Sequence, residues 1–183
     1  MSNEKMAHAM GGTHDQILER RAESLALESI DEEVSDRVSM LLFRIGEEWY
    51  AVRVGDVREI FQEYDVTLVP CTPQCILGVT NVRGEILSVT DPALLMGLGK
   101  IAGVPVAQPP AVVVKNASIA TALVVDEIGD IVEVPNEAVE PPVSIIDRTQ
   151  AEFVAGSVFV GGTMIGLLDV DRVLAPVDTT GRH

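Results

Sequence analysis

Two aspartates at matching places in a duplicated segment are the first residues that could do chemistry. Asp91 and Asp169 each close an aliphatic stretch and lie 78 positions apart. Two carboxylates that share one proton form the catalytic pair of an aspartic protease. The Asp-Thr/Ser-Gly loop of such enzymes is absent, because Asp91 precedes Pro-Ala and Asp169 precedes Val-Asp. Each aspartate also precedes a short predicted helix, so we expect both to be N-caps.

The two cysteines, Cys71 and Cys75, could in principle bind a metal or form a redox pair. They are four positions apart with no histidine nearby, whereas zinc takes four nitrogen or sulfur ligands. We expect two reduced, dispensable thiols. The sequence contains no serine–histidine–aspartate, cysteine–histidine or phosphate-binding glycine motif. It therefore predicts no catalytic residue, no metal and no cofactor.

Arg83 interrupts an internal repeat. Residues 78–91 align without a gap with residues 156–169, and this alignment pairs Arg83 with Gly161. Both copies keep what the fold needs, so a large cation in one copy is a candidate for function. The alternative is an ordinary solvated cation in a turn. A chain with a net charge of −15 can use the rigid fork of an arginine in a specific ion pair.

Short strands must position these residues. The repeat extends upstream at an offset of 71, where residues 41–46 align with 112–117 and residues 56–60 with 127–131. Further along, the pattern predicts two hairpins, 76–82 with 85–90 and 153–160 with 163–169. Many short strands with turn signals are typical of small closed barrels. We expect two barrels spanning roughly 38–100 and 108–175, and the chain can cross between them near either end.

Composition excludes several classes of partner. A net charge of −15 over 183 residues repels nucleic-acid phosphates and anionic lipid. The longest apolar stretch, residues 101–114, is interrupted by prolines and cannot span a bilayer. The N-terminus lacks a signal peptide, so we expect a cytoplasmic protein without membrane insertion. Residues 1–37 are expected to form a tail with an amphipathic helix over 14–29, and residues 176–183 a second tail.

Residues 78–84, Gly-Val-Thr-Asn-Val-Arg-Gly, resemble the Asn-Leu-Arg-Gly motif of the CheW family of chemotaxis coupling proteins. The upstream Val57–Ile60 run and the closing Leu-Leu-Asp-Val-Asp of residues 167–171 resemble that family too. The resemblance covers about residues 38–175. One departure is Ser88, which stands where the family usually has proline. Another is Pro92, which follows Asp91 in place of leucine.

The resemblance implies a mainly β fold of two five-stranded barrels that are similar to Src-homology-3 domains and share a core. It also implies a non-catalytic adaptor in bacterial chemotaxis. The implied partners are the regulatory domain of a CheA-type histidine kinase and the cytoplasmic tip of methyl-accepting chemotaxis receptors, in receptor arrays at the inner membrane. The partner-binding residues implied on this chain are Val57, Glu59, Gly78, Asn81 and Arg83.

Glu59 becomes the candidate partner of Arg83, because the family places this acid on the same surface. Its repeat counterpart, Asp130, has no arginine to meet. Strand alternation puts Val57 on the same face as Glu59, so an exposed Glu59 implies an exposed Val57. Two other functions stay open: a coupling protein of a non-flagellar pathway, and a small β-barrel enzyme, which the absence of a clustered catalytic set disfavours.

Overall fold

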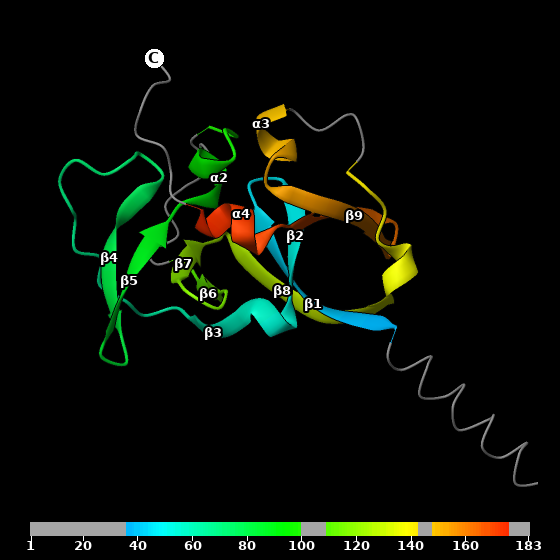
Figure 1. The fold of residues 1–183 in the computed structure, drawn as a ribbon, viewed down its shortest axis with the longest axis horizontal. Coiled ribbons are helices and arrows are strands. Elements are labelled where there is room, and N and C mark those ends of the chain that lie inside the picture. The colour runs from blue at the N-terminus through cyan, green and yellow to red at the C-terminus, as the bar shows by residue number, and fades with distance from the viewer. Residues whose placement is uncertain (1–35, 100–108, 143–147, 176–183) are drawn as a thin grey trace, which may run out of the picture. The chain divides into compact units, whose positions relative to one another are not determined.

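The computed structural model describes residues 36–99, 109–142 and 148–175, and its strands form two five-stranded sheets (Figure 1). This confirms the mainly β fold. The chain divides into Met1–Arg37 and Val38–His183, and the hydrophobic core of both sheets lies within the second unit. The helix expected over 14–29, the linker of residues 100–108 and the C-terminal tail lie outside the described residues.

The first sheet has the strand order β8-β1-β2-β10-β9 and the second has β3-β6-β7-β5-β4. The strands of the first sheet are β1 Arg37–Ile45, β2 Glu48–Arg53, β8 Glu127–Pro135, β9 Val154–Val160 and β10 Thr163–Leu168. Those of the second sheet are β3 Val57–Phe61, β4 Ile76–Val82, β5 Glu85–Thr90, β6 Ala111–Lys115 and β7 Ala120–Val124. The helices are η1 Val54–Asp56, α2 Pro92–Leu95, η2 Asn136–Ala138, α3 Arg148–Ala151 and α4 Val170–Leu174.

The two sheets are related by the sequence repeat. Each of β1 to β5 has its counterpart five strands later, and exchanging counterparts converts one strand order into the other. The registers agree as well. Gly166 lies opposite Tyr50 in the parallel pair β10–β2, and their counterparts Ser88 and Thr121 lie opposite each other in the parallel pair β5–β7.

Neither sheet is a contiguous half of the chain, which differs from the barrel ranges expected from sequence. The ranges 38–100 and 108–175 each contribute strands to both sheets, because the first two strands of each copy pair with the last three of the other. The chain crosses at η1, which joins β2 of the first sheet to β3 of the second. This exchange binds the two sheets through continuous backbone as well as through side-chain packing.

The main hydrophobic core joins the two sheets. Its buried side chains come from β1, β2, β9 and β10 of one sheet, from β6 and β7 of the other, and from α2, α4 and the residues next to them. Its members include Phe43, Tyr50, Leu123, Met96 and Leu174. Figure 1 shows α4, in orange-red, at the centre of this arrangement. Burial of these apolar side chains is the main source of the stability of the fold.

The repeated aspartates are helix caps, as predicted. The Asp91 carboxylate accepts hydrogen bonds from the backbone N–H groups of Ala93 and Leu94 at the start of α2. The Asp169 carboxylate accepts one from the N–H of Arg172 at the start of α4. Each therefore satisfies donors that a helix N-terminus leaves unpaired. This role accounts for their presence in both copies.

Two repeated glycines are required by a close approach of backbone. A Cβ atom on Gly78 would lie 2.3 Å from the carbonyl oxygen of Thr67, and one on Gly156 would lie 2.7 Å from that of Glu140. In each copy the segment after the third strand makes a single bridge, Thr67 with Val79 in one copy and Glu140 with Ser157 in the other. Between β3 and β4, Thr67 is the one residue that makes such a bridge.

Candidate partner-binding site

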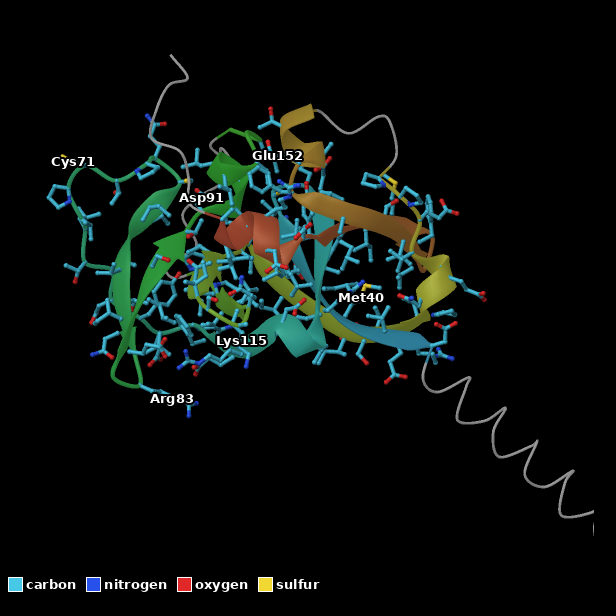
Figure 2. All side chains as sticks on the ribbon, viewed as in Figure 1. Met40, Cys71, Arg83, Asp91, Lys115 and Glu152 are labelled. Atoms are coloured by element: carbon cyan, nitrogen blue, oxygen red, sulfur yellow. The ribbon has the colours of Figure 1, made fainter. Side chains whose placement is uncertain are left out.

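Arg83 lies in the two-residue turn that joins β4 to β5. Arg83 and Gly84 have φ angles of 52° and 90°, the left-handed pair that defines a type I′ hairpin turn. Asn81 supports the turn, because its side-chain oxygen accepts a 2.8 Å hydrogen bond from the N–H of Gly84. Figure 2 shows Arg83 at the tip of this hairpin.

The β9–β10 turn has the same backbone with different residues. Gly161 and Gly162 have φ angles of 58° and 85°. Glycine adopts this conformation freely, whereas an arginine in it carries a steric penalty of about 1 kcal/mol or more. Arg83 is therefore a strained residue at a place where the other copy uses glycine. Such strain persists where the surrounding structure holds it, and it is concentrated at functional sites.

Four charged side chains form a cluster beside the turn. Arg83 Nε donates to Glu59 Oε2 at 2.9 Å. Arg58 lies 3.5 Å from the other oxygen of Glu59 and 2.5 Å from Glu85. The Glu59 side chain is 18% exposed and the Arg83 side chain 81% exposed. Two guanidinium groups therefore hold a largely covered carboxylate, and Arg83 presents the rest of its guanidinium to solvent.

A β-bulge in β3 brings Arg58 into this cluster. Val57 pairs with Val114 and Glu59 with Val113, so Arg58 is an extra residue in the ladder. The expectation that Val57 shares an exposed face with Glu59 is wrong for this reason. Val57 is partly buried and packs against the main core, while Arg58 and Glu59 approach each other on one side.

The structure brings together three of the five predicted partner-binding residues, namely Glu59, Asn81 and Arg83. Val57 lies under this cluster against the core, and Gly78 is buried further along β4. Sequence reasoning missed Arg58 and Glu85. The available signal was their position, since Glu85 directly follows the turn and Arg58 directly precedes Glu59.

Three other titratable side chains stand out among the described residues. Burial raises the pKa of the Cys75 thiol, whereas Cys71 is exposed. Burial and the neighbouring Glu48 carboxylate raise the pKa of Tyr50. Across residues 36–99, 109–142 and 148–175, no group of three or more His, Cys, Asp or Glu side chains is placed to hold a metal ion. No helix within these same ranges is long and apolar enough to cross a membrane.

Comparison with known proteins gives one consistent family. Residues 39–177 match the family model of the CheW-like domain. The probable chemotaxis protein CheW of Rhizobium etli is 30% identical over 156 residues, which cover 85% of this chain and 97% of that protein. The chemotaxis protein CheW of Rhizobium meliloti is 30% identical over 134 residues, 73% of this chain and 85% of the relative.

A solved structure has the same fold. The scaffolding protein TtCheW from Thermoanaerobacter tengcongensis superposes with a TM-score of 0.64 at 28% sequence identity. The match covers 72% of this chain and 88% of that one. The two-sheet architecture is therefore shared with a protein described as a scaffold.

Proposed function

The chain belongs to the CheW-like family, and on this premise we propose that it is a non-catalytic adaptor that couples chemoreceptors to a CheA-type histidine kinase. Its partners are the regulatory domain of the kinase and the cytoplasmic tip of methyl-accepting receptors. It works in the cytoplasm, within receptor arrays at the inner membrane. Its mechanism is binding: it holds the kinase relative to the receptor tip, so that the conformation of the receptor biases kinase activity.

The observation that carries the proposal is the Arg83–Glu59 pair in its strained turn. The fold gains little from the pair, because an exposed ion pair contributes less than about 1 kcal/mol to stability. The backbone strain at Arg83 is of the same size or larger. A residue that adds no net stability, and that glycine replaces in the other copy, is best explained by binding.

The five predicted partner-binding residues contribute to this surface in two ways. Arg83, Glu59 and Asn81 offer exposed or partly exposed polar groups for a partner. Val57 and Gly78 support the surface, since Val57 packs against the core and Gly78 lets Thr67, between β3 and β4, approach β4. We place the receptor tip on this surface because an acidic and a basic group side by side can pair with a polar helix hairpin.

The test is receptor-dependent kinase activation, reconstituted with receptor-containing membranes and the CheA-type kinase of the same organism. We expect Arg83→Ala to change the free energy of unfolding by less than about 1 kcal/mol and to lower activation at least about fivefold. The matched control is Arg44→Ala. Arg44 forms an ion pair of the same Nε–Oε2 geometry with Glu127 at 3.0 Å in the other sheet, and its loss should leave activation unchanged.

The charge exchange Arg83→Glu with Glu59→Arg separates two forms of the proposal. Restored activation means that the pair acts mainly on itself, by fixing the turn. Continued loss means that each side chain meets its own group on the partner. Activation by Arg83→Ala equal to that of the parent, across a range of protein concentrations, would reject the proposed role of this surface.

A further inference from the structure

A hollow of about 330 Å³ lies beside the parallel pair of β5 and β7. It is close to the end of β4 and β5 where Ile76 pairs with Thr90, whereas the Arg83 turn closes the other end. Its volume lies at the lower end of the range for ligand pockets, which begins at about 300 Å³. Its lining includes the apolar side chains of Ile76, Leu95 and Ile119 and the hydroxyls of Ser88, Thr90 and Thr121.

The repeat shows what fills the corresponding place in the other sheet. Thr121 is the counterpart of Tyr50, and Ser88 is the counterpart of Gly166. A Cβ atom on Gly166 would lie 3.1 Å from the Tyr50 ring, so that ring lies directly over the glycine. The buried Tyr50 hydroxyl donates to Glu48 at 2.6 Å. One sheet thus fills this place with its own tyrosine, and the other, with a short Thr121, leaves it hollow.

Three hydroxyls beside the hollow share hydrogen bonds. Thr121 Oγ1 lies 2.7 Å from Ser88 Oγ, 2.8 Å from Thr90 Oγ1 and 3.0 Å from the carbonyl oxygen of Ser88. Each hydroxyl carries one proton and two lone pairs, so the three together hold more lone pairs than protons. A donor on an occupant that reaches Ser88 or Thr90 therefore meets an acceptor.

We propose that this hollow binds a tyrosine side chain of a partner protein. An aromatic ring suits the apolar walls, as the Tyr50 ring does in the other sheet. The phenolic O–H can donate to a lone pair of the Ser88 or Thr90 hydroxyl. The site lies at the opposite end of the β4–β5 hairpin from Arg83 and is independent of the Arg83 surface.

Two model compounds test the proposal on the full chain. The ¹⁵N-labelled protein is titrated with N-acetyl-L-tyrosinamide and, separately, with N-acetyl-L-phenylalaninamide, and backbone amide shifts are followed. We expect saturable shifts centred on Ser88, Thr90 and Thr121, with about fivefold tighter binding of the tyrosine compound, the contribution of one hydrogen bond. Arg83→Ala should leave this titration unchanged.

Substitutions separate the ring from the hydroxyl. Ser88→Ala should reduce the preference for the tyrosine compound to about twofold, because one acceptor is lost. Thr121→Tyr should place a ring in the hollow from within and abolish binding. Thr163→Ala, which removes an exposed hydroxyl from the other hairpin, is the control and should have no effect. Shifts spread away from these residues, or equal affinities for the two compounds in the parent, would overturn the proposal.

Discussion

The β4–β5 and β9–β10 hairpins share one backbone conformation but present different side chains to solvent. Both turns have the same left-handed pair of φ angles, and both hairpins lead into a helix capped by aspartate. At the positions of Asn81 and Arg83 the second hairpin has Phe159 and Gly161. Phe159 is 66% exposed and lies across from Met164, which is 44% exposed. The two copies thus share the hairpin backbone, while only the first has the charged cluster.

The edge strands β3 and β8, each at the end of the strand order opposite the hairpin, differ for a packing reason. Arg58 in β3 has Gly129 as its counterpart in β8. A Cβ atom on Gly129 would lie 2.7 Å from the ring of Trp49 and 3.1 Å from the side chain of Leu42. In the first sheet the ring of Trp49 therefore occupies the space beside Gly129, and an arginine side chain does not fit there. The second copy has a glycine at this position for packing, whereas the first copy has Arg58, which forms ion pairs.

The largest expected effect is on the shared backbone. Gly78→Ala should lower the free energy of unfolding by about 3 kcal/mol, because the new Cβ meets the Thr67 carbonyl and the residue has a φ of 151°. Gly156→Ala should cost about 2 kcal/mol, since its clash with Glu140 is milder. Chemical denaturation measures both. A larger cost at Gly156 than at Gly78 would contradict the close approach as the reason for these glycines.

The second expected effect comes from introducing an arginine into the β9–β10 turn, at the position that corresponds to Arg83. Gly161→Arg places a side chain at a φ of 58° and should lower the free energy of unfolding by about 1 kcal/mol or more. Thr163→Arg, at the next exposed residue after the turn, is the control and should stay within about 0.5 kcal/mol of the parent. Equal costs for the two variants would mean that the turn conformation imposes no strain on arginine.

Local chemistry made much of this structure predictable from sequence. The gap-free repeat from Gly78 to Asp91 predicted both hairpins, both turns and both caps, because each depends on residues close together in the chain. The Arg83–Glu59 contact was also predicted, from the family pattern, and is confirmed at 2.9 Å. Binding by these residues stays a prediction.

The features that sequence did not predict depend on distant partners. Strand patterns identify β1 and β2 but not that they pair with β8 and β10, since this pairing is set by register with residues far away. The bulge at Arg58 has no signature in alternation, so Val57 was placed on the wrong face. The hollow at Ser88 required knowing that Tyr50 is the spatial counterpart of Thr121.

A third expected effect concerns the thiols. Cys75 and its counterpart Phe153 each present a carbonyl to the N–H of a capping aspartate, Asp91 and Asp169 respectively, so the position is structural in both copies. A thiol reagent should modify Cys71 rapidly and Cys75 slowly at neutral pH, because burial raises the pKa of Cys75 and so disfavours its reactive thiolate. The modification rate of Cys75 should rise as the pH is raised.

The variant Cys71→Ser with Cys75→Ser should cost about 1 kcal/mol of stability, because a hydroxyl replaces a buried thiol, and should leave partner binding unchanged. Its kinase-activation assay runs beside the parent at equal folded concentration. Rapid modification of both thiols, or a loss of binding in the double variant, would contradict a purely structural role for this segment.

The smallest expected change in stability comes with the most direct test of the central claim, that Arg83 serves binding and not folding. Arg83→Gly gives the first turn the residues of the second. Relief of strain offsets the lost ion pair, so the free energy of unfolding should stay within about 1 kcal/mol of the parent. Calorimetric titration with a receptor-tip fragment should show affinity reduced by more than about tenfold. An unchanged affinity, or a loss of stability large enough to unfold the chain, would contradict the claim.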